Sequence, residues 1–336
     1  MRFSKILLNA TAAATMLAAL AACSGGSKKK GATSTSTSGL ATIACDQTFQ
    51  NIISQEIDVF EYQYPNANIM PWYLDESSCI DSLLDFSTKL AVISRPLSEK
   101  EVSYLKSNKR AVRQSRIAVD ALALIVNPAN PVEILSVNEI ADILRGKQQR
   151  WDEIEVMPKG FDSIKVVFDD QGSSLVKYMR DSIMGGDHFG PNIFVQGSPD
   201  AVFEAVARNR NAIGVLGVSW ISADMRSRER SREEIAAAIE RNDVDSLVFD
   251  SSVKVLKVRG RDEVTAYKPY QQYIYEGSYP LYRSIWMIST GAGGTLSHGF
   301  YSFVTGFNGQ KIIQMTGILP ATLHPRMVNV STSGSN

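Results

Sequence analysis

The sequence contains few of the side chains on which metal binding and acid–base catalysis usually depend. Its only histidines, His188, His298 and His324, are far apart along the 336 residues. The sequence has no HExxH motif, no set of Cys and His at metal-binding spacing and no G-x-S-x-G motif. We therefore expect a protein that is not an enzyme and that uses no metal and no cofactor.

The chain also lacks net charge. Lys and Arg number 35, and Asp and Glu also number 35. A balanced charge produces no global field that would attract nucleic acid, so no nucleic-acid partner is expected. The hydrophobic content of 44% is ordinary for a globular protein. The length is enough for about two domains.

The N-terminus has the pattern of a secretory lipoprotein signal. Arg2 and Lys5 precede an apolar stretch, Ile6–Ala22, that is short for a membrane span and is followed at once by Ser, Gly and Lys. Leu20–Cys23 matches a lipobox. We expect residues 1–22 to be the signal peptide, Cys23 to be lipidated, and residues 23–39 to form a flexible tether. These features predict a membrane-anchored protein of the periplasm.

Only two cysteines remain once Cys23 carries lipid. Cys45 and Cys79 both follow predicted strands. An oxidising compartment permits a disulfide between them. The alternative is that each is a small, buried thiol. The sequence leaves both alternatives open.

Three strands near the N-terminus each end in a polar loop that leads into a helix. The strands are predicted at residues 41–44, 68–74 and 90–93. Strands that alternate with helices indicate an α/β fold with a largely parallel sheet. Ligands of such sheets bind beyond the carboxyl ends of the strands. The hydroxyl groups expected along that edge are those of Thr48, Ser77, Ser78 and Ser94.

The segment Ser163–Met184 repeats the pattern with a stronger signal for anion binding. A buried strand is followed by the loop Asp169–Ser174, and then by a helix with Val176, Met179 and Ile183 on one apolar face. The free N–H groups and the dipole at a helix N-terminus favour an anion. The alternative is an ordinary helix cap and turn.

Two long apolar strands, at residues 116–127 and 280–289, are expected to join two lobes and to act as the hinge. The first lobe is then discontinuous, with residues 40–126 and 280–328, and the second contains residues 127–279. Other predicted elements are capping boxes at Ser98/Glu101 and Ser136/Glu139, helices at 199–207, 226–241 and 299–316, and strands at 212–220 and 246–258.

Several motifs carry a family resemblance. They are Asp46–Phe49 (DQTF), Ser94–Ser98 (SRPLS), Leu135–Ile154, Asp169–Ser174 (DDQGSS), Asn211–Trp220 (NAIGVLGVSW) and the Gly317–Pro320 ending. In these motifs the chain resembles the substrate-binding lipoproteins of phosphate ABC transporters. That resemblance implies a type II periplasmic binding protein fold, with two lobes and a ligand cleft between them.

The resemblance also implies a function and a set of ligand residues. The protein is expected to capture inorganic phosphate or a similar oxyanion for ABC permease subunits by hinge closure, as a monomer and without chemistry on the ligand. The alternatives are an oxyanion sensor or surface interaction lipoprotein on the same fold and, less favoured, a periplasmic phosphatase. The implied ligand residues are Gln47, Thr48, Phe49, Ser77, Ser78, Ser94, Arg95, Gln171, Gly172, Ser173 and Ser174.

Two positions depart from the family pattern. Family members carry an aspartate where this chain has Ser94, and an arginine where it has Phe168. Arg95 is a candidate source of the missing charge-assisted hydrogen bonds. Asp46 or Asp170 is a candidate acceptor for a ligand proton.

Overall fold

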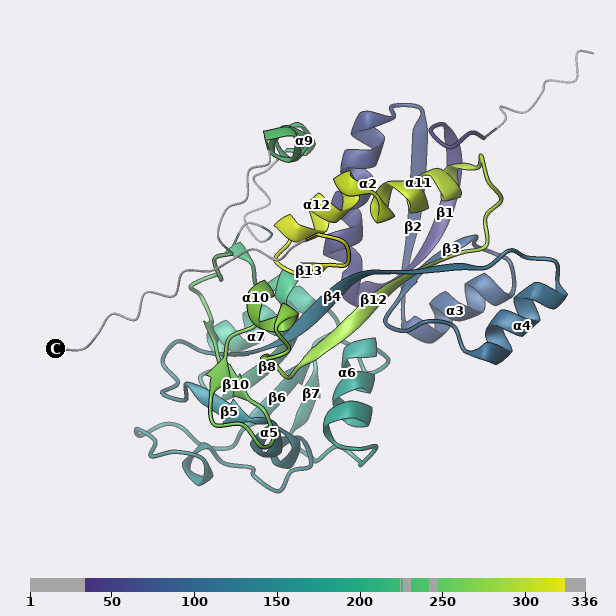
Figure 1. Cartoon of the computed structure of the whole chain (residues 1–336). Helices are drawn as coiled ribbons and strands as arrows, with labels where there is room; N and C mark the ends of the chain where they lie inside the picture. Colours follow the sequence, from purple (N-terminus) through teal and green to yellow (C-terminus); the bar gives the residue numbers. More distant parts are fainter. Residues whose placement is uncertain (1–33, 224, 226–230, 242–246, 324–336) are drawn as a thin grey trace, which may run out of the picture. The chain divides into compact units, whose positions relative to one another are not determined.

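Figure 1 shows the computed structural model of the chain, which describes residues 34–223, 225, 231–241 and 247–323. The predicted signal peptide and the lipidation site at Cys23 lie outside these residues. None of the helices in the described ranges is both long and apolar enough to cross a membrane.

The main sheet has the strand order β2-β1-β3-β12-β4-β8-β6-β7, and β13 and β9 add to β4. Its strands are β1 (Gly39–Asp46), β2 (Ala67–Leu74), β3 (Leu90–Ile93), β4 (Arg113–Val126), β6 (Lys165–Phe168), β7 (Ile193–Val195), β8 (Ala212–Gly217), β9 (Lys254–Val255), β12 (Tyr282–Ser289) and β13 (Leu319–Pro320). A small sheet, in the order β11-β10-β5, contains β5 (Ile134–Ser136), β10 (Lys257–Arg259) and β11 (Ala266–Tyr267).

The strand pairing divides the sheet into two parallel parts that are joined by antiparallel strands. β1 pairs in parallel with β2 and β3, and β6 pairs in parallel with β8 and β7. We call the part with β1–β3 the first lobe and the part with β6–β8 the second lobe. Between them run β4 and β12, which are antiparallel to each other (Figure 1). The predicted two-lobe α/β fold is confirmed.

A single strand belongs to both lobes. In β4, residues 113–121 pair with β12 and residues 122–126 pair with β8. Because the strand is continuous and buried from Ile117 onward, it links the two hydrophobic regions without a loop. The sequence predicts this crossing strand at residues 116–127, close to the observed bounds.

The helices cover both faces of the sheet. They are α2 (Gln50–Gln63), α3 (Glu76–Leu84), α4 (Glu99–Ser107), α5 (Val137–Leu144), α6 (Ser174–Tyr178), α7 (Pro199–Arg208), α9 (Arg232–Arg241), α10 (Gln271–Tyr275), α11 (Leu296–Thr305) and α12 (Phe307–Met315). Short helical turns are η1 (Gln47–Phe49), η2 (Trp151–Glu153), η3 (Met179–Ile183) and η4 (Val218–Trp220). Both predicted capping boxes, at Ser98/Glu101 and Ser136/Glu139, are confirmed.

Three predicted elements differ from the structure. The strand predicted over 212–220 ends at Gly217, and Val218–Trp220 is a helical turn that carries Trp220 towards the first lobe. The helix predicted over 299–316 is two helices, which meet at Gly306. The strand predicted over 246–258 is reduced to β9 and β10, because Phe249 forms only an isolated bridge with Ser222 and residues 251–252 form a turn.

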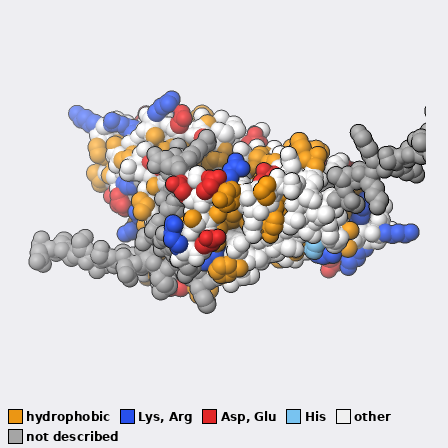
Figure 2. Space-filling model, turned by 90° about the horizontal axis from the view of Figure 1, so that it is seen from above, with side chains coloured by type: hydrophobic (Ala, Val, Ile, Leu, Met, Phe, Trp, Pro, Cys, Tyr) orange, Lys and Arg blue, Asp and Glu red, His pale blue; other side chains and the backbone are white. Residues whose placement is uncertain are grey.

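The mixed-charge helix predicted over 226–241 is described from Arg232, since residues 226–230 lie outside the described ranges. Its apolar face is buried. Ile235 and Ile239 of α9 pack with Val59 of α2 and Ile312 of α12. The opposite face is charged, and acidic and basic side chains are mixed over the surface in Figure 2. The mixture agrees with the balanced composition of the chain.

Part of the predicted tether is ordered. Thr35 pairs with Ser38 in an isolated bridge, and Gly39 begins β1. The Ser34 hydroxyl accepts a hydrogen bond from the Leu296 amide at 3.3 Å. These contacts attach residues 34–39 to α11, so they are not a free linker.

Cys45 and Cys79 are free thiols, and both are buried. Adjacent side chains of a strand point to opposite faces of a sheet. Cys45 packs in the core beneath α2, whereas Cys79 of α3 packs with Ala44 on the other face. Of the two alternatives for these cysteines, the disulfide is therefore not formed.

Glu56 of α2 is a buried carboxyl group. It is 0% exposed, and neither carboxyl oxygen has a hydrogen-bond partner among the described residues. Burial raises the pKa of Glu56 well above the ordinary value for glutamate. Burial thus disfavours the charged form of this carboxyl group relative to the neutral form.

This burial predicts that Glu56 destabilises the fold as the pH rises. The pKa of Glu56 is higher in the folded protein than in the unfolded chain. Its contribution to the folding stability is therefore fully present below about pH 4.5, near the unfolded pKa, and is lost as the pH rises through the folded pKa. Between the unfolded and the folded pKa of Glu56, the free energy of unfolding of the wild type, relative to that of Glu56→Gln, should fall by about 1.4 kcal/mol for each pH unit. Urea unfolding at pH 5 and pH 8 measures it. Asp58→Asn, on the exposed face of the same helix, is the control, and an equal change in both variants would contradict the prediction.

Candidate functional site

The centre of the molecule contains a buried ion pair on the two crossing strands. Arg283 of β12 lies directly opposite Asp120 of β4 in the strand register. The Arg283 Nη2 and Nε atoms donate to Asp120 Oδ2 at 3.1 and 3.3 Å. The two residues are 5% and 1% exposed. Gly217 makes room for this pair, since a Cβ there would lie 2.8 Å from Asp120 Oδ2.

The same guanidinium contacts hydroxyl groups from both lobes. Arg283 Nη1 donates to Ser174 Oγ at 2.6 Å, and Nη2 donates to Thr48 Oγ1 at 3.0 Å. The two hydroxyl oxygens are 3.3 Å apart. The guanidinium carbon also lies 4.5 Å from the centre of the Phe49 ring. Arg283, Thr48, Ser174, Phe49 and Asp120 thus form one buried cluster between the lobes, which we call the central cluster.

Local capping positions the two hydroxyl groups. Asp46 ends β1 and accepts hydrogen bonds from the Thr48 amide at 2.9 Å and from the Thr48 hydroxyl at 2.8 Å. Ser173 caps α6, and its hydroxyl donates to Asp169 Oδ1 at 2.8 Å. Ser174 is consequently the first residue of α6. Its position places a hydroxyl and the positive end of the helix dipole beside Arg283.

Three buried carboxyl groups surround these donors. Asp46, Asp120 and Asp169 are each at most 1% exposed, and each has one oxygen without a hydrogen-bond partner among the described residues. Burial raises the pKa of all three, and Arg283 opposes the rise. Oxygens of this kind can accept a proton from a bound group. The cluster therefore combines donors for an anion with acceptors for protons on that anion.

The second lobe adds a contact from η4 to the same loop. Trp220 Nε1 donates to the Thr48 carbonyl at 2.8 Å, and the Ser219 hydroxyl donates to Asn51 Oδ1 at 3.2 Å. These bonds join residues more than 160 positions apart in the chain. The loop that carries Thr48 is thus held from both lobes.

Several residues predicted for the site lie outside the central cluster. The Ser94 amide donates to Glu76 Oε2 at 3.0 Å, and the Ser94 hydroxyl contacts the same oxygen. Arg95 forms two bonds to Glu101, at 2.8 and 2.9 Å. Its guanidinium is therefore engaged away from Thr48 and Ser174. Ser78 donates to Asp75 Oδ2 at 2.5 Å as part of the α3 cap.

The remaining predicted residues are at the surface or have structural contacts. Ser77, Gln171 and Gly172 are exposed, and Gln47 is half-buried. The Gly172 amide donates to Asp170 Oδ1 at 2.8 Å, so Asp170 caps a turn. The structure brings together Thr48, Phe49 and Ser174 from the predicted set, and places Ser173 directly beside them.

Sequence reasoning missed Arg283 and Asp120. Both lie inside apolar strands, in the runs PLYRSIWMIS and RIAVDALALIV. Charged residues are almost never fully buried unless they are paired. Asp120 is the only acid of its run, and Arg283 is the only charged residue of the other run. This was the available signal for an ion pair between the crossing strands.

Within the described ranges, no group of three or more His, Cys, Asp or Glu side chains is arranged to hold a metal ion. The carboxyl groups of the central cluster instead surround a guanidinium and two hydroxyl groups. These features define a two-lobe fold with a buried, charged and hydroxyl-bearing cluster at its centre.

Residues 30–307 match the model of the PBP superfamily domain, and the chain belongs to this family. Among curated proteins, it is similar to the phosphate-binding protein PstS of Pseudomonas aeruginosa, with 23% identity over 219 residues. The match covers 62% of this chain and 67% of the relative. The relative is named as a binding protein, which agrees with the expectation that the chain is not an enzyme.

Solved structures show the same fold. A candidate phosphate ABC transporter substrate-binding protein of Clostridium perfringens, solved with bound phosphate, has a TM-score of 0.66 and 21% identity. The match covers 84% of this chain and all (100%) of that one. An ABC-type phosphate transport receptor of Vibrio cholerae has a TM-score of 0.60 and 19% identity, with coverage of 84% and 100%.

Proposed function

We propose that this protein captures inorganic phosphate, or a closely similar oxyanion, at the central cluster and delivers it to the permease of an ABC importer. The observation that carries the proposal is the buried guanidinium of Arg283, which contacts one hydroxyl group from each lobe. A ligand bound there would contact both lobes at once. Binding would then favour the closed arrangement of the lobes, because the ligand contacts are complete only in that arrangement.

Arg283 can supply the positive charge that an arginine at position 168 provides in family members. A guanidinium presents several N–H donors in a fixed plane and forms strong, charge-assisted bonds to phosphate oxygens. Arg283 reaches the hydroxyl groups from a crossing strand, whereas Phe168 ends β6 and is 0% exposed. The charge that the ligand needs is therefore supplied from the hinge.

Asp46 is the favoured acceptor for a ligand proton. It is buried, it belongs to the loop of Thr48, and one of its oxygens has no partner among the described residues. Asp170, the other candidate, is only half-buried and caps a turn through the Gly172 amide. Phosphate and arsenate carry protons at neutral pH, whereas sulfate does not. A site with buried acceptors should prefer the protonated anions, since sulfate would leave those acceptors unpaired.

Related proteins and the N-terminal pattern support the remaining parts of the proposal. The relatives are named as phosphate-binding or phosphate-transport proteins. We propose a monomer that is located in the periplasm and anchored through lipid at Cys23. We also propose that the lobes comprise residues 40–126 with 280–328, and residues 127–279.

Calorimetry of the unlipidated chain with phosphate, arsenate, sulfate and molybdate tests the proposal. Phosphate should bind, and sulfate should bind at least tenfold more weakly. Thr48→Ala and Ser174→Ala should each weaken phosphate binding by about 1–3 kcal/mol, since each removes one donor from a buried anion. Ser302→Ala, which removes an exposed hydroxyl group, is the control. Unchanged affinity in both site variants would exclude the central cluster as the binding site.

A further inference from the structure

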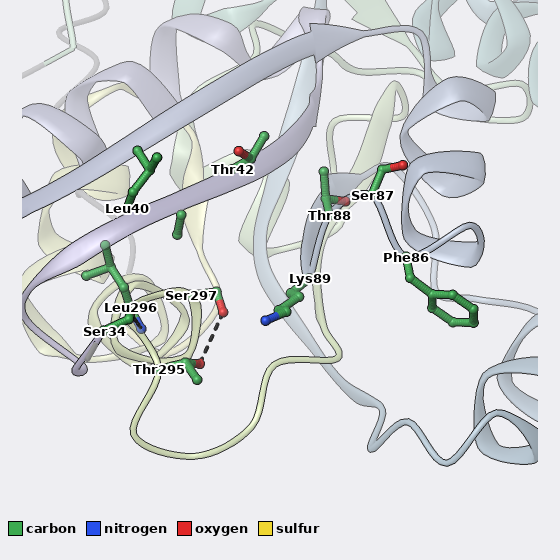
Figure 3. A pocket seen from close by; sticks show the side chains of 11 residues that line it. Ser34, Leu40, Thr42, Phe86, Ser87, Thr88, Lys89, Thr295, Leu296 and Ser297 are labelled. Atoms are coloured by element: carbon green, nitrogen blue, oxygen red, sulfur yellow. Dashed lines mark hydrogen bonds between the residues drawn. The ribbon is translucent and has the colours of Figure 1, made fainter. Parts of the chain in front are cut away.

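A pocket with a mixed polar and apolar lining lies at the opposite ends of the strands from the central cluster. It has a volume of about 210 Å³ and is bordered by the start of β1, the residues before β3 and the first turn of α11 (Figure 3). Thr48 follows the end of β1, whereas this pocket includes Leu40, near the beginning of the same strand. The pocket is therefore separate from the site proposed for transport.

The charged group of this pocket is a single lysine. Lys89 extends towards Thr295 and Ser297 of the α11 segment in Figure 3. The Lys89 ammonium group forms no salt bridge or hydrogen bond with the described residues. No Asp or Glu lines the pocket. The lining thus has one positive charge and no negative charge, in contrast to the three carboxyl groups around Arg283.

The N-terminus of α11 adds donors on the opposite wall. Thr295 is the N-cap residue of this ten-residue helix, but its side chain does not cap the helix. Ser34 accepts the Leu296 amide at 3.3 Å. Ser297 is 3% exposed, and its hydroxyl lies 3.2 Å from that of Thr295. The Thr295 hydroxyl itself donates to the Ala292 carbonyl at 2.7 Å. The features of this wall suited to an oxyanion are therefore the N–H groups and the dipole of the first helical turn.

Thr88 provides an independent indication of a ligand. It lines the pocket and is 2% exposed, yet its hydroxyl has no hydrogen-bond partner among the described residues. A buried hydroxyl group without a partner costs about 1–3 kcal/mol relative to a bonded one. An anion held by Lys89 and the α11 N-terminus could accept this hydrogen bond.

We propose that this pocket is a second oxyanion site that binds a phosphate group through Lys89, Thr88 and the N-terminus of α11. The group belongs either to inorganic phosphate or to the headgroup of an anionic phospholipid. Ser34 in the pocket wall is 11 positions after Cys23 (34 minus 23). That length of chain spans at most about 40 Å. A protein anchored at Cys23 would therefore keep the pocket within reach of headgroups.

Two probes, used on the unlipidated full chain, distinguish the two sources. Inorganic phosphate is titrated by calorimetry, and vesicles of phosphatidylglycerol are tested by flotation, with phosphatidylcholine vesicles as the neutral comparison. A second phosphate equivalent in the titration identifies free phosphate as the source. Flotation only with phosphatidylglycerol identifies the headgroup. If the titration shows no second phosphate equivalent and the protein does not float with phosphatidylglycerol vesicles, the proposal is wrong.

The variants locate the binding. We call binding of phosphate at the central cluster the first event, and binding of phosphate or phosphatidylglycerol at this pocket the second event. Lys89→Gln and the nearly isosteric Thr88→Val should weaken the second event at least tenfold and leave the first unchanged. Lys257→Gln removes an exposed lysine from β10 and should change neither event. Ser174→Ala should weaken only the first event, so failure of the transport site and failure of this pocket give different results. If Lys89→Gln and Thr88→Val both retain the wild-type second event, the pocket is not the site.

Discussion

Replacing Arg283 by methionine should abolish phosphate binding at the central cluster. Methionine keeps an unbranched apolar stem but removes the donors to Thr48 and Ser174 and the positive charge that lies among three buried carboxyl groups. Loss of a buried, hydrogen-bonded charge from a binding site typically costs 2–5 kcal/mol or more. We expect calorimetry to show at least about a hundredfold weaker binding of phosphate.

The conservative variant Arg283→Lys separates charge from geometry. A lysine ammonium group is a point charge that cannot reproduce the planar set of donors. It should therefore recover only part of the affinity. Arg95→Met is the matched control, because Arg95 bonds to Glu101 outside the cluster. If Arg95→Met abolished binding and Arg283→Met did not, the charge for the ligand would come from the Ser94–Ser98 loop, contrary to our assignment.

Replacing Asp120 by asparagine should destabilise the protein by about 3–5 kcal/mol. The reason is that breaking a buried ion pair leaves the partner charge uncompensated. Arg283 is 5% exposed, so water cannot replace the carboxylate. Urea unfolding of the wild type and of the variant at neutral pH measures the difference.

The double variant Asp120→Asn/Arg283→Met tests this explanation. It leaves no unpaired guanidinium in the core, so most of the lost stability should return, although phosphate binding should not. Glu204→Gln on α7 is the surface control. Its ion pair with Arg208 has a similar distance of 3.1 Å, but both side chains are more than half exposed. It should cost no more than about 1 kcal/mol. A similar loss in Asp120→Asn and Glu204→Gln would refute the buried-charge argument.

The secondary structure of this protein could be predicted well where it depends on neighbouring residues. Helix caps are local interactions, and the hydroxyl groups of Ser98 and Ser136 each bond to an amide three positions along the chain. The exceptions, such as the turn at Val218–Trp220, occur where side chains bond to distant parts of the molecule.

The candidate site was harder to predict, because each hydroxyl group could serve either as a cap or as a ligand donor. Thr48 and Ser94 both follow strands of the first lobe. The structure directs Thr48 to Arg283 and Ser94 to Glu76. Which role each side chain has depends on the partners that the other elements bring to it. Those partners are not neighbours in the sequence.

The alternation of strands and helices, the helix ends and the hydroxyl-bearing loops were determined by the sequence alone, because they depend on propensities and on contacts a few residues apart. Only the tertiary structure decided that Arg283 meets Asp120, 163 positions away, and that Thr48 meets Ser174, 126 positions away. It also placed Cys45 and Cys79 on opposite faces of the sheet. Strand order and register establish these pairings, and neither is encoded in any short stretch of the chain.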